Sequence, residues 1–190
     1  MEVRAQQNDP ESDFWIDWDT NKVEYGVIIT GYRGSKKEVR IPPRIQSYPV
    51  TEIGESAFAG CESLTEVTIP NSVTIIWDGA FECCTSLTKV KIPDSVTIIG
   101  NRAFADCTSL TKVKIPDSVI SIENSAFAHC TSLTSVTFQG TFNSDNVDGY
   151  TIDYSDCGYI EGLHEEYIED DGGPGTYKRF AGGYTWRKLK

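Results

Sequence analysis

Cysteine and histidine, the side chains that most often act as nucleophiles or zinc ligands, are few in this chain. Among 190 residues there are six cysteines and two histidines. A structural zinc site takes four such ligands at close spacing, and a catalytic zinc site takes three protein ligands and a water. The sequence contains no Cys-x-x-Cys pair, and His164 precedes two glutamates without the second histidine of a zinc-protease motif. His129 is expected to face solvent. We therefore predict no metal and no cofactor.

Other catalytic signatures are also missing from the sequence. There is no Gly-x-Ser-x-Gly elbow, no phosphate-binding loop and no dinucleotide fingerprint. The segment 143–149, Asn-Ser-Asp-Asn-Val-Asp-Gly, is similar in composition to a calcium loop. Val147 occupies a ligand position, however, and no glutamate follows at the required spacing. We interpret this segment as a polar turn and predict that the protein is not an enzyme.

Four of the cysteines are evenly spaced, 23 residues apart: Cys61, Cys84, Cys107 and Cys130. If each spacing is one coil of a stacked structure, these side chains are parallel and about 4.8 Å apart, an orientation that suits a disulfide poorly. We interpret them as a ladder of small buried thiols. The cysteines outside this ladder, Cys83 and Cys157, are expected to be the more reactive.

The cysteine spacing belongs to a longer repeat in the middle of the chain. Four copies of 23 residues begin at Val50, Val73, Val96 and Val119, and the last copy ends at Thr141. A fixed period of this length is typical of a solenoid, in which each repeat forms one coil and neighbouring coils bury one another's apolar residues. The sequence therefore predicts that equivalent residues stack in columns and that no single repeat folds alone.

One half of each copy has the pattern of a short strand. In the first copy Leu64, Val67 and Ile69 are apolar. Val67 and Ile69 are two residues apart, so they share one face of an extended chain. Pro70 follows and cannot donate a hydrogen bond to a ladder, so the strand must be short. One such strand in each coil predicts a parallel sheet.

The other half of each copy predicts a short helical turn. Ala57 and Phe58 follow an isoleucine by four and five residues, a spacing that suits one turn of α- or 3₁₀-helix. The phenylalanine is a large wedge that recurs as Phe81, Phe104 and Phe127. We expect this column to widen its side of the stack and make it convex, which would leave the strand side concave.

The repeat as a whole resembles a known family. Its consensus, L-x-x-V-x-I-P-x-S-V-T-x-I-x-x-x-A-F-x-x-C-x-S-L, is similar to the leucine-rich repeat of the treponemal, BspA-like type over residues 38–141. The resemblance implies an α/β solenoid, that is, a curved leucine-rich repeat stack with a parallel sheet on the concave face. It also implies protein–protein recognition, with adhesion at a bacterial surface as the expected role.

Segments outside the repeats are predicted to cap the open ends of the stack. Residues 1–12 are polar and expected to be flexible, and residues 13–49 form a β-rich N-terminal cap with a partial first repeat. Residues 50–141 are the four leucine-rich repeats. Residues 142–190 form an acidic, irregular C-terminal cap with a tail hairpin that turns at 181–183.

The predicted binding surface is the concave side of the sheet. Residues that flank each strand valine point away from the core. We expect this surface to consist of Glu66, Thr68, Lys89, Lys91, Lys112, Lys114, Ser135 and Thr137, preceded by Glu38 and Arg40 in the partial copy. The four lysines lie together in its middle. They predict a partner with an acidic surface, either another protein or a host matrix or cell-surface glycoprotein.

Other interpretations of the lysines remain open. Residues 84–96 and 107–119 are identical, so duplication alone also explains the second lysine pair. Asp94 and Asp117, three residues after a lysine in each copy, are expected to neutralise part of the charge. The acidic segment that begins at Phe142 could also fold over the lysines as an internal counter-charge.

Composition limits the range of partners. The net charge of −11 and the pI of about 4.6 argue against nucleic acid or an anionic membrane surface. No run approaches the ~20 apolar residues of a membrane helix, and the first residues contain no apolar signal core. The protein is expected to be cytoplasmic, or exported with its signal removed. Two further functions stay open: a structural or self-assembly module that forms homo-oligomers through cap or tail edges, and an intracellular scaffold.

Overall fold

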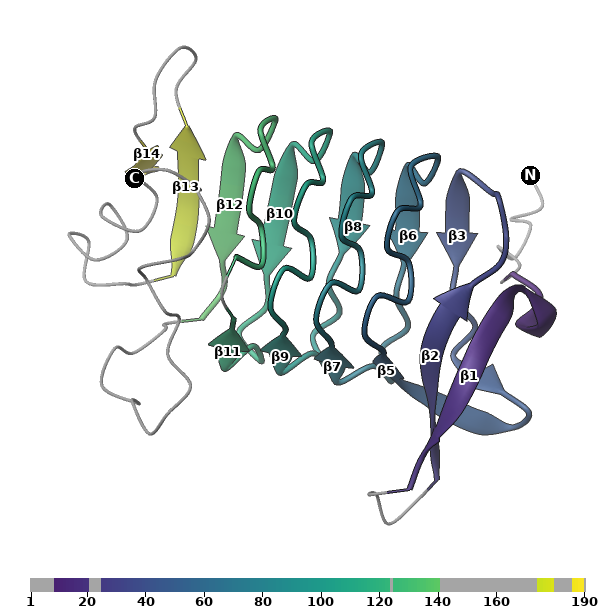
Figure 1. Ribbon diagram of the computed structural model, residues 1–190. Helices are drawn as coiled ribbons and strands as arrows, with labels where there is room; N and C mark the ends of the chain where they lie inside the picture. Colours follow the sequence, from purple (N-terminus) through teal and green to yellow (C-terminus); the bar gives the residue numbers. More distant parts are fainter. Residues whose placement is uncertain (1–8, 21–24, 124, 141–173, 180–185, 190) are drawn as a thin grey trace, which may run out of the picture.

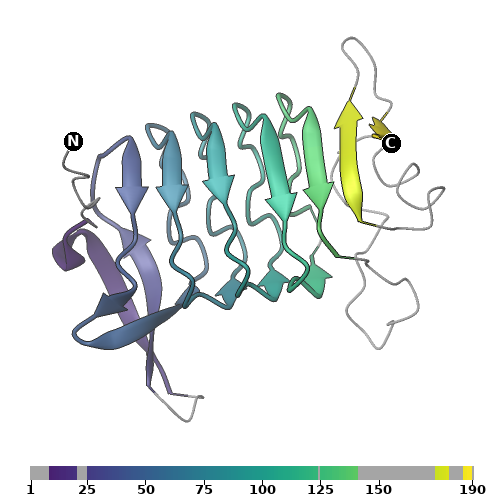
Figure 2. The ribbon, with the colours of Figure 1, turned by 180° about the vertical axis from the view of Figure 1, so that it is seen from behind.

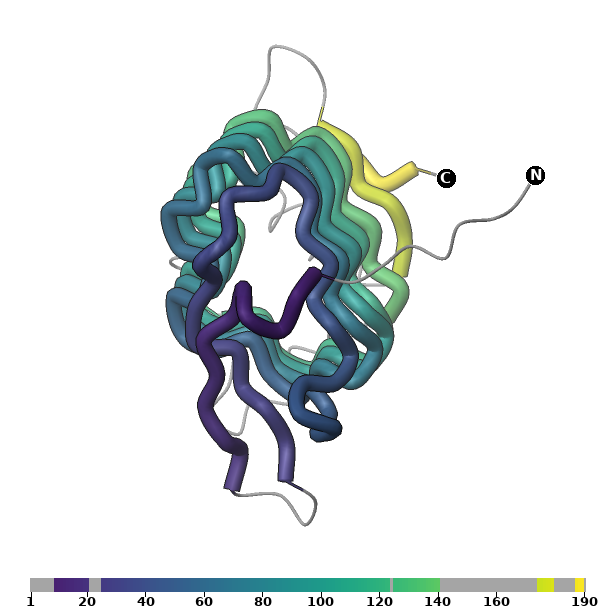
Figure 3. The backbone as a smooth tube through the Cα atoms, turned by 90° about the vertical axis from the view of Figure 1, so that its right-hand side faces the viewer, coloured from purple at the N-terminus to yellow at the C-terminus, as the bar shows by residue number. Residues whose placement is uncertain are grey.

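The chain winds into a stack of coils that follow one another along a common axis (Figure 1). The computed structural model describes residues 9–20, 25–123, 125–140, 174–179 and 186–189. Viewed along the axis, successive coils superimpose on one another (Figure 3). Each coil contributes one strand to a larger row and another strand, in most coils only two residues long, to a second row. The predicted solenoid is confirmed. None of the helices in the described part of the chain is long and apolar enough to cross a membrane.

The larger row has a solvent side that we call the sheet face (Figure 2). Its strands are β3 (Glu38–Arg40), β6 (Glu66–Thr68), β8 (Lys89–Lys91), β10 (Lys112–Ile115) and β12 (Ser135–Phe138). Paired neighbours are parallel and in register, so Val67 pairs with Val39 and Val90, and Val113 pairs with Val136. Residues 23 positions apart therefore stack on these strands, as the sequence predicts.

A second row of parallel strands, which the repeat pattern does not predict, runs along another side of the coils. It consists of β5 (Tyr48–Ile53), β7 (Ile75–Ile76), β9 (Ile98–Ile99) and β11 (Ser121–Ile122). Ile53, Ile76, Ile99 and Ile122 pair in order along the row and are buried. Most of these strands are only two residues long, and so short a segment carries no visible alternation of apolar and polar residues.

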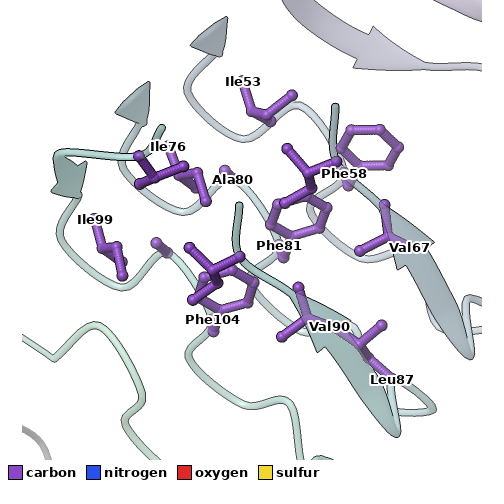
Figure 4. Packing of buried hydrophobic residues seen from close by; sticks show 14 of the residues in the cluster. Ile53, Phe58, Val67, Ile76, Ala80, Phe81, Leu87, Val90, Ile99 and Phe104 are labelled. Atoms are coloured by element: carbon purple, nitrogen blue, oxygen red, sulfur yellow. The ribbon is translucent and has the colours of Figure 1, made fainter. Parts of the chain in front are cut away.

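The interior of the stack contains an aromatic column flanked by aliphatic side chains (Figure 4). The rings of Phe58, Phe81, Phe104 and Phe127 lie nearly parallel, with successive centroids 4.9, 5.1 and 5.2 Å apart. Tyr32 extends the column, stacked on Phe58 at 5.3 Å. Aromatic pairs at this spacing contribute about 0.5–1.5 kcal/mol each beyond the burial of their area. The predicted phenylalanine column is therefore confirmed and ties neighbouring coils together.

The turns that carry these phenylalanines differ from the predicted helical turn. The N–H of Phe58 donates to the carbonyl of Ala80 on the next coil at 2.7 Å, whereas the N–H of Ala59 donates three residues back, to Ser56, at 3.0 Å. Alternate N–H groups therefore point to the next coil, and a helix would direct all of them back along the chain. The helix prediction is wrong because the spacing of apolar residues does not reveal this alternation.

The alternation requires a left-handed backbone at two positions of each turn. The first position is Ser56, Gly79, Arg102 or Ser125, and the second is Gly60, Cys83, Asp106 or His129, with φ between 53° and 70°. Left-handed geometry costs a residue other than glycine about 1–2 kcal/mol. The hydrogen bonds between coils and the burial of the phenylalanine must offset this cost in every turn.

The N-terminal end of the stack is covered by an antiparallel ribbon. A 3₁₀ turn, η1 (Glu11–Asp13), leads into β1 (Phe14–Asp19), which pairs with β2 (Gly26–Tyr32). β2 then runs parallel to β5 and so continues the second row, while β4 (Arg44–Ile45) pairs antiparallel with β5. The ribbon thus gives the first full coil a paired neighbour on this side.

Asp9 closes the edge of β3 at the same end. Its carboxylate accepts a hydrogen bond from the N–H of Arg40 at 2.6 Å and pairs with Lys36, and its own N–H donates to the carbonyl of Arg40 at 2.9 Å. Its side chain is buried. Asp9 is therefore held against the stack, although residues 1–12 were expected to be flexible, and η1 has no buried residue. Residues 1–8 lie outside the described part of the chain.

The C-terminal end of the sheet is extended by a hairpin. β13 (Gly175–Arg179) pairs antiparallel with β12 on one side and with β14 (Trp186–Lys188) on the other. Tyr177 is fully buried and meets the ring of Phe138 edge-on at 5.8 Å. The acidic segment expected from residue 142 onwards lies outside the described residues up to residue 173, so its predicted cover over the lysines stays a prediction.

Replacing Gly60 with alanine is expected to lower the free energy of unfolding by about 1 kcal/mol. Gly60 has φ 70°, and an added Cβ would meet nothing within 4 Å, so the cost comes from backbone conformation alone. Asparagine tolerates this region better, so Gly60→Asn should retain more stability than Gly60→Ala. Urea denaturation of the three proteins measures the difference. Equal stability of Gly60→Ala and wild type would contradict the assigned strain.

Candidate functional site

The sheet face presents four exposed lysines, which we call the lysine patch: Lys89 and Lys91 on β8, and Lys112 and Lys114 on β10. Each pair flanks a buried valine. Side chains alternate along a strand, so the lysines point to solvent while the valines enter the core. β8 and β10 lie next to each other (Figure 2). The patch therefore gathers positive charge on a chain whose net charge is −11.

One lysine of the patch is paired with a carboxylate. Nζ of Lys89 lies 2.8 Å from Oε1 of Glu66 on β6, and the two side chains are 67% and 37% exposed. An ion pair this open contributes at most about 1 kcal/mol. In the described part of the chain no carboxylate pairs with the other three lysines, and Asp94 and Asp117 form no ion pair there. Thr68, beside Glu66 in the predicted surface, is half-buried.

The C-terminal end of the predicted surface is covered. Ser135 is only 8% exposed, in register with Lys178 of the adjoining hairpin. Thr137 is half-buried, and its hydroxyl lies 2.9 Å from that of Thr176 on β13. Ser135 is therefore not the open surface residue that we predicted. The cause is the docking of β13 on β12, which a repeat pattern ending at Thr141 does not predict.

Ladder pairing is interrupted at the lysine patch. β6 pairs with β8 and β10 pairs with β12, but no pairing between β8 and β10 is present in the described residues. The N–H of Thr88 donates to the carbonyl of Thr65 one coil back at 3.0 Å, and no equivalent bond joins Thr111 to Thr88. The second row stays paired at this step, Ile99 with Ile122. The break is therefore confined to the side that carries the lysines.

The break coincides with the step at which lysines of neighbouring coils would stack on one another. The two strands have the same sequence, Lys-Val-Lys-Ile, and regular parallel pairing would place each ammonium over another at about 4.8 Å. Two such charges repel by about 1 kcal/mol in water. At the neighbouring steps a lysine faces Glu66 or Ser135 instead, and the pairing is intact.

The hairpin brings two further cations to the sheet face. Lys178 lies opposite Ser135 in the register of β13 with β12, and Arg187 lies opposite Lys178 in the register of β14 with β13. Directly opposed residues share one side of a sheet, and both side chains are exposed. Our sequence prediction omitted them. In the sequence, Lys178 is indicated only by its alternation with the apolar Tyr177. That alternation assigns Lys178 to the sheet face only when β13 is known to pair with β12.

The part of the chain that the structure describes contains one group of potential metal ligands, away from the lysine patch: Glu82, Cys83 and Asp106. The guanidinium of Arg102 already occupies it, with Nη2 2.7 Å from Glu82 and 3.1 Å from Asp106. Desolvation by the surrounding protein and the two carboxylates raise the pKa of the Cys83 thiol, which disfavours the thiolate that binds metals. These groups suit an arginine-centred ion pair better than a metal site.

The column thiols are sealed inside the stack. The S–H groups of Cys84, Cys107 and Cys130 donate to the carbonyl of a phenylalanine one coil back, at 3.2, 3.3 and 3.2 Å. Burial raises the pKa of Cys84 and Cys130 to about 12 and also raises the pKa of Cys107. The predicted ladder of buried thiols is confirmed for these three, whereas Cys61 is half-buried.

Comparison with known proteins agrees with the geometry. The sequence matches six copies of the BspA type leucine-rich repeat region over residues 37–155. The leucine-rich repeat protein of T. pallidum is 35% identical, with a TM-score of 0.65, over 67% of this chain and 59% of that protein. A leucine-rich repeat protein from Bacteroides capillosus is 30% identical, with a TM-score of 0.58, over 67% of this chain and 95% of that protein. The chain thus spans less than two thirds of the T. pallidum protein. No curated protein matches significantly in sequence.

Replacing Lys112 and Lys114 with threonine is expected to raise the free energy of unfolding by about 0.5–1 kcal/mol, because it removes repulsion across the break. For a chain of this size that raises Tm by about 1–4 °C. The gain should shrink in 1 M NaCl, where the charges are screened. The exposed Lys37→Thr serves as a control away from the patch. A gain that does not depend on salt would show that repulsion is not its cause.

Thiol labelling checks the sealed column. With iodoacetamide at pH 8, the exposed Cys83 should be alkylated in the native protein, while Cys84, Cys107 and Cys130 should react only after denaturation. Raising the pH to 9.5 should increase the rate at which Cys83 is alkylated and leave the buried thiols unlabelled. Both pH values lie far below the pKa of about 12 of Cys84 and Cys130. Peptide mapping by mass spectrometry assigns the sites. Rapid labelling of Cys107 in the native protein would disprove the burial.

Proposed function

The chain belongs to the BspA-type leucine-rich repeat family, and from this membership we propose that it recognises other proteins through its lysine patch. The observation that carries the proposal is the gathering of four exposed lysines on β8 and β10 of a strongly acidic chain. Strands hold the Cα atoms of these residues in fixed positions. Binding of a partner therefore costs little backbone entropy.

The chemistry of the patch favours a partner with an acidic surface. Among the described residues, none of the exposed large apolar side chains lies on β8 or β10, so the patch offers charge without an apolar anchor. Charge complementarity of this kind speeds association and selects the partner more than it adds affinity. Binding through the patch should therefore be rapid, moderate in affinity and strongly weakened by salt.

We extend the proposal to a role at a bacterial surface, in adhesion to an acidic host matrix or cell-surface glycoprotein. Family membership is its main support, together with the open basic patch, which suits an acidic glycoprotein. In this role the protein acts by binding and needs no catalytic group. The arrangement of arginine and carboxylates around Cys83 gives no support to an enzymatic alternative.

Self-association through the N-terminal cap is a second candidate, favoured by an exposed aromatic group. Trp18 meets Tyr48 edge-on at 5.1 Å, and Tyr25 meets Tyr48 at 6.5 Å. The three side chains are 39–60% exposed, and aromatic residues of this kind often anchor interfaces. Against direct pairing of strand edges, β1 carries a bulge after Trp15 and the polar Asp17, features that hinder such pairing.

The test compares wild-type protein with the quadruple variant K89E/K91E/K112E/K114E. Each is immobilised and exposed to a host extracellular extract and, separately, to a lysate of the source cell. Retained proteins are identified and then measured one at a time by surface plasmon resonance. The proposal expects a host glycoprotein that binds wild type, dissociates as NaCl rises from 50 to 500 mM, and loses at least about tenfold in affinity with the variant.

Matched controls separate charge from folding. K37E makes the same lysine-to-glutamate change at an exposed site away from the patch and should bind like wild type. Circular dichroism checks that the quadruple variant is folded. Full binding by the folded quadruple variant would exclude the lysine patch as the site. Capture of cytoplasmic proteins only would count against adhesion. Concentration-dependent light scattering that is lost in Trp18→Ser, but kept in the quadruple variant, would favour self-association.

A further inference from the structure

The sheet face carries a row of cations that continues past the repeats. In one register row, Glu38, Glu66 and Lys89 pair in order across β3, β6 and β8, and Lys112 and Ser135 pair across β10 and β12. The hairpin then adds Lys178 opposite Ser135 and Arg187 opposite Lys178. From β8 to β14, four of the five positions in this row are basic. The fourth repeat supplies no lysine, and the hairpin restores the charge.

The row also has a defined beginning. Glu66 pairs with Lys89 at 2.8 Å, and Glu38 follows it on β3. The two carboxylates repel an anionic partner that extends beyond β8. The basic part therefore ends at the acidic strands on one side and at β14 on the other. Three bonded strand spacings of about 4.8 Å, with a step of similar width between the neighbouring strands β8 and β10, give it a length of about 19 Å.

Resting on the proposed function, we propose that the hairpin is part of the recognition surface and that this row binds a short, extended acidic peptide segment lying across the strands. Same-side residues of an extended chain are about 6.8 Å apart, so four alternate carboxylates span about 20 Å. If the unbonded step from β8 to β10 is as wide as the bonded steps, the cations lie at about 0, 4.8, 14.4 and 19.2 Å along the row. Flexible lysine and arginine stems span the differences of about 2 Å.

A peptide fits this surface better than a long anionic polysaccharide does. A uniformly charged polymer would have to pass over Glu66 and Glu38, whereas a segment of about seven residues ends before them. The neighbouring register row, which includes Lys114, carries the hydroxyl groups of Thr137 and Thr176. Hydroxyl groups can hydrogen-bond to a peptide backbone. A polysaccharide is therefore the competing outcome of the test.

The experiment uses two peptides of equal composition and charge on the full-length protein. The first, Glu-Ser-Glu-Ser-Glu-Ser-Glu, places its carboxylates at the spacing of the row. The second, Glu-Glu-Glu-Glu-Ser-Ser-Ser, gathers them at one end. Fluorescence anisotropy at 50 mM NaCl should show about fivefold tighter binding of the alternating peptide, because the clustered one cannot reach the hairpin cations.

Variants locate the footprint. K178E/R187E should weaken the alternating peptide about tenfold, and K112E/K114E should weaken both peptides. K178Q/R187Q removes charge without reversing it and should give a smaller loss in the same direction. K37E should leave both affinities unchanged. An unchanged melting temperature shows that the hairpin variants stay folded.

The outcomes distinguish the two proposals. If K112E/K114E weakens binding but K178E/R187E and K178Q/R187Q do not, the hairpin is not part of the binding surface. Only the proposal that the lysine patch binds the partner then remains. Equal binding of the two peptides overturns the fit to an extended segment. If no variant changes binding, both proposals fail. Binding of a heparin-derived hexasaccharide by wild type, with no binding of either peptide, overturns the peptide partner.

Discussion

The structure depends on one constraint: residues 23 positions apart share one backbone conformation, because each coil supplies hydrogen-bond partners for the next. The N–H of each of the first three column phenylalanines donates to an alanine carbonyl one coil on. This requirement overrides side-chain preference. Cys83, Asp106 and His129 all take the left-handed conformation that Gly60 adopts without strain. The intrinsic preferences of these different side chains do not explain why all three adopt the same strained conformation. The shared hydrogen bonds and the buried ring beside each turn impose it on them.

Because each coil is bonded to the next, the first and last coils each lack one neighbouring coil. Segments outside the repeats take the place of that neighbour at both ends. At the N-terminal end Tyr32 continues the aromatic column, and Asp9 occupies backbone groups at the edge of β3. At the C-terminal end β13 pairs with β12 and places Tyr177 against Phe138. Both ends therefore satisfy the same two demands, an aromatic ring for the core and a hydrogen-bond partner for the exposed strand edge.

The 23-residue period made the columns of stacked residues predictable. Features outside the repeat, such as the docking of the C-terminal hairpin, could not be predicted from it. The strand valines, the phenylalanine column and the outward lysines follow from a spacing of 23 residues alone. The turn was misjudged as helical because the positions of Ala57 and Phe58 suit a helix as well as they suit the observed alternation. The burial of Ser135 and the addition of Lys178 depend on where a hairpin docks some 40 residues later along the chain. A contact at that distance leaves no local pattern in the sequence.

The same stacking also decides where function can reside. Inside the coil, stacking like on like is favourable, because a fully buried aliphatic side chain contributes about 1.5–3 kcal/mol. On the sheet face, like charges in one column repel by about 1 kcal/mol per pair, which the core columns can outweigh. A repeat fold can therefore hold a concentrated charge that an unsupported strand would not. The unpaired step between β8 and β10 coincides with the stacked lysines. Beyond it, Ser135 separates the lysines from the hairpin cations, and Lys178 and Arg187 then lie opposite each other on β13 and β14.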